Sequence, residues 1–444
     1  MITGVRMKKN GLLWMVICIP ALGNLLHGYE IGIIAGAMAA MKHSIVLSGA
    51  EHGFIVGAAF YGASLSMLIA GPLADWIGRK SMLIFGAFLI SLGLISIGMA
   101  DGYYGVLWGR LLQGVGVGFV TLVIPMYIAE CTPAHVRGSG TTTVQFFLNG
   151  GILLAAFFAY LLSQEGLWRE MFFYALIPSV MLFFLAFSLP KSPRWLVGKG
   201  RMDEARVVLA SFGDKIQVDN QLAVIKKSHA RHKTNAFSAL WRRKNLLAVL
   251  LVIAVGSLNM LTGINNLLSF APVILKQMGI ESERFSVFGT VIITGINFVM
   301  AFIAVMLVDK VGRKPLLKTG LVGMIIACLI MSGSAYFMAE SPMRGYVVLG
   351  AILMFVTFFA IGPGSMIWLL LSELVPNEVR GIGMSLSLCI LLFVAGSYSA
   401  SFLDLADAFG YGAVFLFCAV VCILYFIIIH YFVPETNGKS LEEI

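Results

Sequence analysis

The sequence predicts an all-α membrane protein whose twelve transmembrane helices form two pseudo-symmetric six-helix bundles. Three observations support this fold class: an apolar composition, twelve long hydrophobic runs and two motifs that each occur twice. Of the 444 residues, 59% are hydrophobic and only 12% are charged, with a mean hydropathy of +0.92. Because soluble domains carry about twice that share of charge, the chain is not expected to form one large soluble core.

The hydrophobic runs are long enough to cross a bilayer, since a spanning helix needs about 20 apolar residues. The runs do not alternate between polar and apolar residues, which favours helices over a β-barrel. We predict spans at residues 13–37, 53–74, 82–100, 104–128, 141–163, 170–189, 246–275, 286–308, 316–338, 345–371, 382–403 and 411–433. The first run lacks a small-residue cleavage site, so we expect it to be retained and not cleaved as a signal peptide.

The distribution of basic residues predicts the orientation of the chain. With an even number of spans, both termini lie on the same side of the membrane. That side holds most of the 31 Lys and Arg residues. The opposite side holds only Lys42, Arg169, Lys276, Arg284 and Arg344. The positive-inside rule therefore predicts cytoplasmic termini, and it explains the net charge of +9 without a nucleic-acid partner.

One long polar segment divides the chain into six plus six spans. We expect an N-terminal bundle over residues 1–189, a cytoplasmic linker over 190–245, a C-terminal bundle over 246–433 and a cytoplasmic tail over 434–444. Within the linker, "MDEARVVLASFG" combines early acidic residues, helical apolar spacing and a closing glycine. This pattern predicts a short helix.

Two charged motifs recur in the same order in both halves. Asp-x-x-Gly-Arg-Lys occurs at residues 75–80 and 309–314, and Glu-x-x-Pro-x-x-x-Arg-Gly occurs at 130–138 and 373–381. Such internal repeats are the layout of alternating-access transporters. We expect the charged residues of the motifs to form a network at the cytoplasmic end of the bundle. They are Asp75, Arg79, Glu130, Arg137, Asp309, Arg313, Glu373 and Arg380.

Several kinds of site are not expected. Five of the six cysteines fall in apolar spans, and the sequence has no Cys/His group at metal-binding spacing and no GxxxxGK[ST] phosphate-binding loop. We therefore predict no structural disulfide, no metal, no cofactor and no ATP-driven pump. The chain is not expected to be an enzyme.

Ionisable residues inside the predicted spans are the first functional candidates. Glu30 lies in the first span and Arg110 in the fourth. A charged side chain at the bilayer centre costs about 2.5–3.5 kcal/mol on insertion scales, so such residues are usually functional. Pairing between them would relieve both costs. His27 precedes Glu30 by three residues, and two interpretations stay open: a packed or water-facing histidine, or a proton relay or substrate contact.

The tenth predicted span contains the helix-breaking stretch "IGPGSM". Gly362, Pro363 and Gly364 lie within it. Because proline removes a backbone hydrogen bond, we predict a break in the helix here. The break suits a hinge of a gate, although a passive kink remains the alternative.

Taken together, these motifs resemble the sugar porter family of the major facilitator superfamily. The matching pieces are "GYEIGIIAGAM", "GPLADWIGRK", "GRLLQGVGVGF", "YIAECTPAHVRG", "LPKSPRWLV", "LTGINNLLSFAPVI", "VDKVGRKPLL", "AIGPGSMIWLLLSELVPNEVRG" and "VPETNGKSLEEI". The resemblance implies the major facilitator fold, with a short cytoplasmic helical domain between the halves. In proton-coupled members the acid at the Glu30 position is the proton site and faces the arginine at the Arg110 position. Members that carry sugar passively tend to lack that acid, and Glu in place of the usual Asp is a departure.

The resemblance also implies a substrate shell, which this chain keeps only in part. The family pattern is present at Gln145, Asn265 and Trp368. Asn259-Met260 replaces two glutamines, Ser269-Phe270 replaces paired tyrosines, and Leu391-Leu392 replaces an amide and a tryptophan. Additional amides occur nearby. The expected substrate-binding residues are Gln145, Asn149, Asn259, Asn265, Asn266 and Trp368.

The resulting hypothesis is a proton-coupled symporter of a sugar or polyol-like solute. We expect a monomer in the lipid of the plasma membrane, or bacterial inner membrane, with the solute and the proton as its partners. A passive uniporter of the same substrates remains open, as does a transporter of another small solute, such as an organic acid or drug-like compound. A membrane sensor that binds a nutrient without transport is the third alternative.

Overall fold

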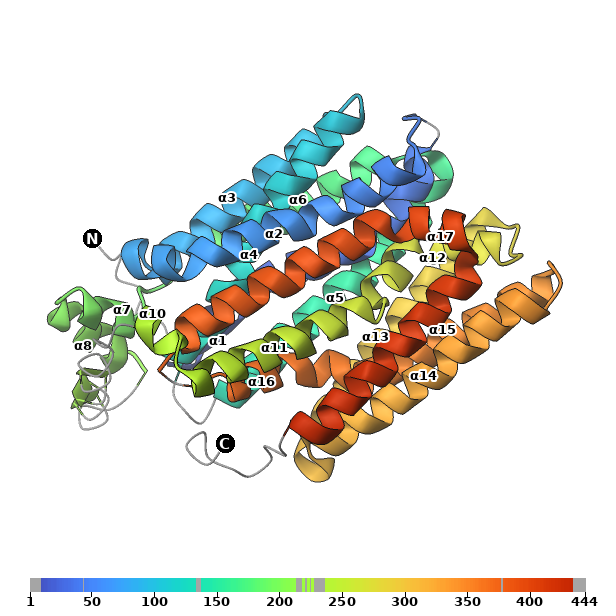
Figure 1. Ribbon diagram of the computed structural model, residues 1–444. Helices are drawn as coiled ribbons and strands as arrows, with labels where there is room; N and C mark the ends of the chain where they lie inside the picture. The colour runs from blue at the N-terminus through green and yellow to red at the C-terminus, as the bar shows by residue number, and fades with distance from the viewer. Residues whose placement is uncertain are drawn as a thin grey trace.

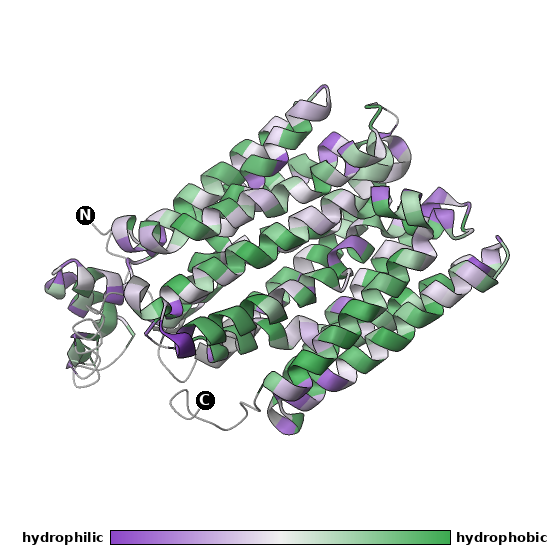
Figure 2. Ribbon diagram, viewed as in Figure 1, coloured by the Kyte–Doolittle hydropathy of each residue, from purple (hydrophilic) through white to green (hydrophobic). Residues whose placement is uncertain are grey.

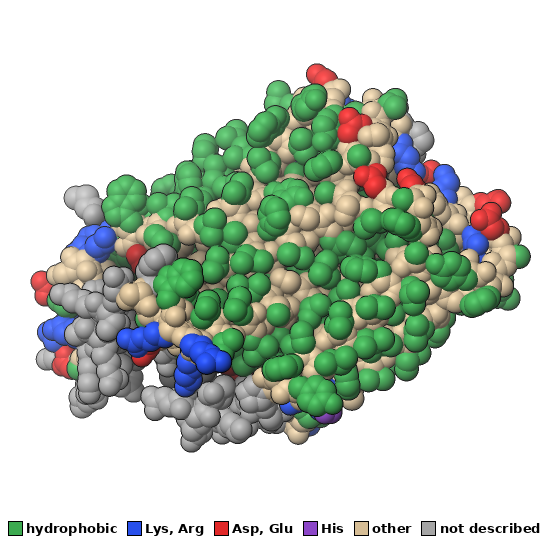
Figure 3. Space-filling model, viewed as in Figure 1, with side chains coloured by type: hydrophobic (Ala, Val, Ile, Leu, Met, Phe, Trp, Pro, Cys, Tyr) green, Lys and Arg blue, Asp and Glu red, His purple; other side chains and the backbone are tan. Residues whose placement is uncertain are grey.

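In this computed structural model the described residues form a bundle of long helices that run side by side (Figure 1). The described residues are 9–42, 44–132, 137–212, 218–219, 222–223, 225–226, 236–376 and 378–433. Among them every element is helical. Apolar residues predominate along the middle of the helices (Figure 2). Hydrophobic side chains cover the flank of the bundle, while charged side chains gather at its two ends (Figure 3). This pattern matches a bilayer-spanning protein.

The first half of the chain contributes six long helices. They are α1 (Lys9–Met41), α2 (Gly49–Ile77), α3 (Arg79–Gly98), α4 (Tyr103–Cys131), α5 (Arg137–Leu162) and α6 (Trp168–Ala186). Glycines allow close helix contact: Gly28 of α1 packs against the backbone of Leu148 in α5, and Gly114 of α4 packs against that of Ala59 in α2. Without a hydrophobic driving force between helices in lipid, such close backbone packing is a main source of association.

Short helices follow the first half. They are α7 (Pro193–Gly198), α8 (Met202–Ala210) and α10 (Ala236–Leu240), whereas the 3₁₀ turn η2 (Ser163–Glu165) lies between α5 and α6. The helix predicted in the polar segment is therefore present as α8. It packs on α7 in a small apolar core of its own. The Trp195 ring lies over Gly78, whose φ is +95°, and its Nε1 donates to the Asp75 carbonyl oxygen at 3.1 Å. These contacts attach α7 to the turn between α2 and α3.

The second half contains two broken spans. Its helices are α11 (Arg243–Leu261), α12 (Ile264–Gln277), α13 (Glu283–Val311), α14 (Arg313–Phe337), α15 (Pro342–Ile361), α16 (Pro363–Leu374) and α17 (Arg380–Phe432). One span is α11 and α12, which meet at Gly263 with φ +92°. The other is α15 and α16, which meet at Gly362 directly before Pro363, so the predicted break is confirmed.

The number of spans agrees with the prediction once α17 is divided. Within the described residues, eleven helical segments are long and apolar enough to cross a membrane. Helix α17 has 53 residues, or about 80 Å at 1.5 Å per residue, and a bilayer core is only about 30 Å thick. Its backbone leaves the helical region at Gly410, with φ 80° and ψ 155°. Helix α17 therefore contains two spans, one on each side of Gly410, and the twelve-span prediction is confirmed.

The two halves meet along pairs of helices. Helix α2 packs on α17, α5 on α13 and α1 on α12. The Ser64 hydroxyl of α2 donates to the Cys389 carbonyl oxygen of α17 at 2.8 Å. At the ends of the helices away from α7, Lys42 Nζ lies 3.5 Å from Glu283 Oε1. The candidate site lies between the two halves of the chain.

Candidate functional site

Glu30 and Arg110 form a buried ion pair between α1 and α4. The Arg110 Nη1 and Glu30 Oε1 atoms are 3.3 Å apart, and the two side chains are only 3% and 5% exposed. Arg110 also donates from Nη1 to Gln113 Oε1 at 3.0 Å and from Nε to the Ile55 carbonyl oxygen at 3.4 Å. The pairing predicted from the cost of intramembrane charge is therefore present.

A small cavity adjoins this pair and draws its lining from both halves of the chain. Its volume is about 40 Å³, enough for a few water molecules. The polar lining residues are His27, Glu30, Arg110, Thr121, Ser269 and Trp368. His27 Nδ1 lies 3.3 Å from Thr121 Oγ1, which holds the ring at the cavity wall. In this conformation the cavity is smaller than the roughly 300–1,000 Å³ of typical small-molecule pockets.

The polar groups of this cavity are unevenly distributed. His27, Glu30, Arg110 and Thr121 come from α1 and α4, and Ser269 comes from α12. Phe60, Met67 and Leu392 of α2 and α17 are apolar. Trp368 of α16 adds an aromatic ring that is 36% exposed. Such a cavity offers a solute both hydrogen-bonding groups and apolar side chains.

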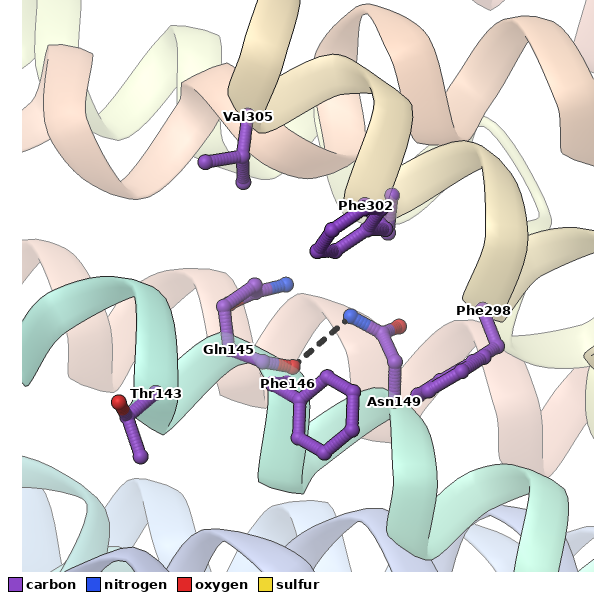
Figure 4. A pocket seen from close by; sticks show the side chains of 8 residues that line it. Thr143, Gln145, Phe146, Asn149, Phe298, Phe302 and Val305 are labelled. Atoms are coloured by element: carbon purple, nitrogen blue, oxygen red, sulfur yellow. Dashed lines mark hydrogen bonds between the residues drawn. The ribbon is translucent and has the colours of Figure 1, made fainter. Parts of the chain in front are cut away.

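A second, larger cavity lies between α5 and α13 (Figure 4). Its volume is about 280 Å³, and its lining consists of Thr143, Gln145, Phe146, Asn149, Phe298, Ala301, Phe302 and Val305. Asn149 Nδ2 donates to the Gln145 carbonyl oxygen at 3.0 Å. The Nδ2 atom of Asn297 donates to Asn149 Oδ1 at 2.9 Å, a buried amide bridge between the two halves.

The other predicted substrate residues lie around the break between α11 and α12. The Asn259 side chain is 1% exposed. Asn265 Nδ2 lies 3.5 Å from Met260 Sδ, and Asn266 Oδ1 accepts from Ser399 Oγ at 2.6 Å. These three asparagines are outside the lining of the two cavities. The structure therefore places Gln145 with Asn149 and Trp368 with the Glu30 pair, but brings the six residues into no single shell.

The repeated motifs form equivalent ion pairs in the two halves. Arg79 Nη1 lies 2.7 Å from Asp75 Oδ1, and Arg79 Nε lies 3.1 Å from Glu130 Oε2. In the second half Arg313 Nη2 lies 3.5 Å from Glu373 Oε1. Each of these pairs joins residues of one half only. The equivalence of the Arg79–Glu130 and Arg313–Glu373 pairs agrees with the internal repeat.

Three other members of the predicted network are placed less fully. Arg380 is half-buried at the first position of α17. The side chains of Arg137 and Asp309 lie outside the described part of the structure, although both residues belong to helices.

The break in the tenth span is held by packing and by a side-chain hydrogen bond. Gly320 of α14 lies directly against Gly362 and Pro363. Ser365 Oγ donates to the Ala360 carbonyl oxygen at 2.6 Å. This carbonyl at the end of α15 therefore has a hydrogen-bond partner close to Pro363, which has no N–H group. Gly364 packs on the Phe359 ring, so the three predicted hinge residues lie at a contact of α14, α15 and α16.

Sequence reasoning missed several polar partners. Gln113 stands one turn after Arg110, and that spacing was a usable signal. Asn297 is an isolated amide in an apolar span, which also marks a candidate. Ser192 precedes Pro193 as a helix cap, and its hydroxyl also donates to the Glu130 carboxylate. Thr121, the partner of His27, had no distinctive sequence signal.

The chain is similar to known proteins over nearly its full length. The model of a family described as "Sugar (and other) transporter" matches residues 16–444. The glucose transporter GlcP of Staphylococcus epidermidis is 31% identical over 440 residues, which cover 99% of this chain and 97% of GlcP. The arabinose-proton symporter of Bacillus subtilis is 30% identical over 448 residues, which cover 99% of this chain and 96% of that protein.

Solved structures agree over the same length. The xylose transporter XylE from E. coli, in a partially occluded inward-open conformation, superimposes with a TM-score of 0.83 at 26% identity. The match covers 97% of this chain and 100% of XylE. The chain therefore has the twelve-helix major facilitator fold.

Proposed function

The chain belongs to the sugar (and other) transporter family, and from this premise we propose that it carries a sugar or polyol across the membrane by proton-coupled symport. The observation that carries the proposal is the buried Glu30–Arg110 pair beside a cavity that both halves line. A carboxylate placed there can exchange a proton with the cavity, and its charge determines what Arg110 contacts. The arabinose-proton symporter of B. subtilis, a relative over nearly the full chain, supports the proton coupling.

We propose that Glu30 is the proton site. While Glu30 is ionised, it holds the Arg110 guanidinium at 3.3 Å and neutralises it. Protonation removes the negative charge and ends the ion pairing, so Arg110 relies on Gln113 and the Ile55 carbonyl oxygen alone. This change lets α1 and α4 move relative to each other. Release of the proton on the other side restores the pair and resets the cycle.

Substrate binding in this proposal joins the two halves. His27 and Thr121 of the first half and Trp368 of the second half face the same cavity. A solute that contacts both sides stabilises the closed state, which is a differential interaction of the kind that alternating access requires. Gln145, Asn149, Asn259, Asn265 and Asn266 remain candidates for the surrounding hydroxyl contacts, and His27 remains the candidate proton relay.

The charged motifs and the helix break have conformational roles in this proposal. The pairs Arg79–Glu130 and Arg313–Glu373 hold the ends of neighbouring helices within each half, so each half moves as a unit. The Gly362-Pro363-Gly364 break serves as the hinge of a gate formed by α16. We further propose a monomer in the plasma membrane with cytoplasmic termini and with bundles over residues 1–189 and 246–433, joined by the linker over 190–245.

Uptake into proteoliposomes tests the proposal. The full-length protein is supplied with a panel of sugars, polyols and organic acids, with and without an inward proton gradient. We expect a sugar or polyol to accumulate only with the gradient. Glu30→Gln should abolish accumulation but keep exchange of labelled solute at equal concentrations. The matched control is Glu281→Gln, which removes an exposed acid outside the cavity.

Two results would contradict proton coupling. Full gradient-driven accumulation by Glu30→Gln would show that another group carries the proton. Uptake by the wild type that equilibrates without accumulating, whatever the gradient, would identify a passive uniporter.

A further inference from the structure

The Arg110 guanidinium has two acceptors close to one of its nitrogen atoms. Arg110 Nη1 lies 3.3 Å from Glu30 Oε1 on α1 and 3.0 Å from Gln113 Oε1, one turn further along α4. Only the contact with Gln113 is a hydrogen bond, because Glu30 Oε1 has no hydrogen-bond partner within the described residues. Nη1 therefore donates to the neutral amide, and its approach to Glu30 is an ion pair without a hydrogen bond.

Gln113 is held behind Arg110, away from the cavity. It is only 3% exposed and is not among the residues that line the cavity. Helix α3 packs tightly at this point, since a Cβ atom on Gly93 would lie 2.7 Å from the Gln113 backbone nitrogen. The Arg110 Nε atom donates to the Ile55 carbonyl oxygen of α2. Two neutral groups therefore fix the guanidinium, whatever the charge on Glu30.

Few ionisable groups surround this pair. Besides Glu30 and Arg110, His27 is the one titratable residue that lines the cavity. The Tyr29 hydroxyl is turned toward α6 and donates to the Met171 carbonyl oxygen at 2.8 Å. The other long helices that pack on α1 or α4 carry Asp, Glu, His, Lys and Arg only in their first or last turns; they are α2, α3, α5, α6, α12 and α13. The exact placement of Arg110 therefore determines the charge balance at Glu30.

An amide and a carboxylate thus compete for the same donor. A hydrogen bond between a guanidinium and a carboxylate is stronger than one to a neutral oxygen, and it favours the ionised carboxylate. While Gln113 binds Nη1, Glu30 does not receive that bond. The amide also keeps Arg110 in place after Glu30 has taken up a proton.

We propose that Gln113 is a positioning residue that sets how readily Glu30 accepts a proton, by holding Arg110 short of a hydrogen bond with the carboxylate. The inference rests on the proposed function in taking Glu30 to be the proton site of transport. Without the amide, Nη1 can donate to Glu30 and the pair becomes harder to protonate. With a carboxylate in place of the amide, Arg110 is held more firmly away from Glu30. The second negative charge then also favours protonation of Glu30.

Infrared titration of the full-length protein in phospholipid nanodiscs measures the protonated Glu30 carboxyl. Its band is identified in each background as the band that Glu30→Gln removes. At the pH where half of Glu30 is protonated in the wild type, Gln113→Leu should lower the ratio of protonated to ionised Glu30 about tenfold, the effect of one hydrogen bond to a charged group. Gln113→Glu should raise this ratio.

Gln277→Leu is the matched control, because it makes the same change at an exposed amide at the end of α12. It should leave the ratio unchanged. If the wild type accumulates a solute in the proteoliposome assay, half-maximal uptake by Gln113→Leu should need about tenfold more protons.

The outcomes separate this role from the proposed function. An unchanged ratio in Gln113→Leu, shifts of the same sign in both Gln113 variants, an equal shift in Gln277→Leu, or a Glu30 band that does not titrate would overturn the positioning role. Opposite shifts in the two Gln113 variants, without accumulation of any panel solute by the wild type, would instead refute symport and leave the positioning role standing.

The two assays together also test the proton site. If the infrared ratios shift in opposite directions while the pH dependence of uptake stays the same in Gln113→Leu, Glu30 is not the proton site of transport. The positioning role of Gln113 would stand in that case too.

Discussion

Replacing one partner of the Glu30–Arg110 pair should destabilise the protein more than replacing both. The two side chains are 5% and 3% exposed, so either single change leaves a buried charge without its counter-charge. Removing one partner of a buried pair costs about 3–5 kcal/mol, whereas an apolar replacement of both is often neutral. We expect Glu30→Leu to lower the free energy of unfolding by about 3 kcal/mol, the lower end of that range. The loss is limited because Arg110 keeps its hydrogen bonds to Gln113 and to the Ile55 carbonyl oxygen. The double variant Glu30→Leu/Arg110→Leu should recover most of this loss.

The loss of stability caused by the other single change, Arg110→Leu, should depend on pH. In Arg110→Leu the Glu30 carboxylate loses its counter-charge, and its Oε1 has no hydrogen-bond partner within the described residues. A buried carboxyl can remove this cost by taking up a proton, whereas a guanidinium cannot lose one. The destabilisation of Arg110→Leu should therefore shrink as the pH falls from 8 to 5. The stability of the Glu30→Leu variant itself should change little over this range, because the remaining Arg110 cannot lose a proton.

Denaturant unfolding in detergent micelles at pH 5 and pH 8 measures these differences. Glu340→Leu is the matched control, because its partner Arg344 is also buried while the Glu340 side chain is 87% exposed. Arg344 keeps two backbone carbonyl partners there, so the control should lose less than about 1 kcal/mol. Losses that add in the double variant, or an Arg110→Leu loss that does not change with pH, would refute the reasoning.

Three further changes test other parts of the fold. Gly78→Ala should lower the free energy of unfolding by about 1–2 kcal/mol, because its φ of +95° disfavours a side chain; an unchanged unfolding midpoint would contradict this. Asn149→Leu should cost about 0.5–1.5 kcal/mol, and a double-mutant cycle with Asn297→Leu should give a coupling of similar size; additive losses would exclude the inter-half amide bond. Lys42→Glu should lower the free energy of unfolding by less than about 1 kcal/mol, but it should widen the distance between spin labels on the ends of α1 and α13. Adding Glu283→Lys in the same chain should restore that distance. No change of distance in either variant would show that the pair does not hold these ends together.

The features that sequence predicted well are those that local physics decides. Apolar runs of bilayer length predicted the spans, because backbone groups in lipid must be satisfied within a helix. The break at Pro363 was predictable because proline lacks an N–H group. The break at Gly263 was not predicted, because a glycine in an apolar run is also compatible with a continuous helix. The Glu30–Arg110 pair could be inferred because two intramembrane charges cost too much apart.

The sequence by itself determined the membrane class, the number of spans, the internal repeat and the buried charge pair. Only the tertiary structure decided which polar residues meet. Asn149 and Asn297 are 148 positions apart and form one hydrogen bond, while Asn259 and Asn266 lie away from both cavities. Helical periodicity assigns a residue to a face of its own helix, but it does not say which helix packs against that face. That choice depends on close backbone packing between helices far apart in the chain, as where Gly28 meets Leu148.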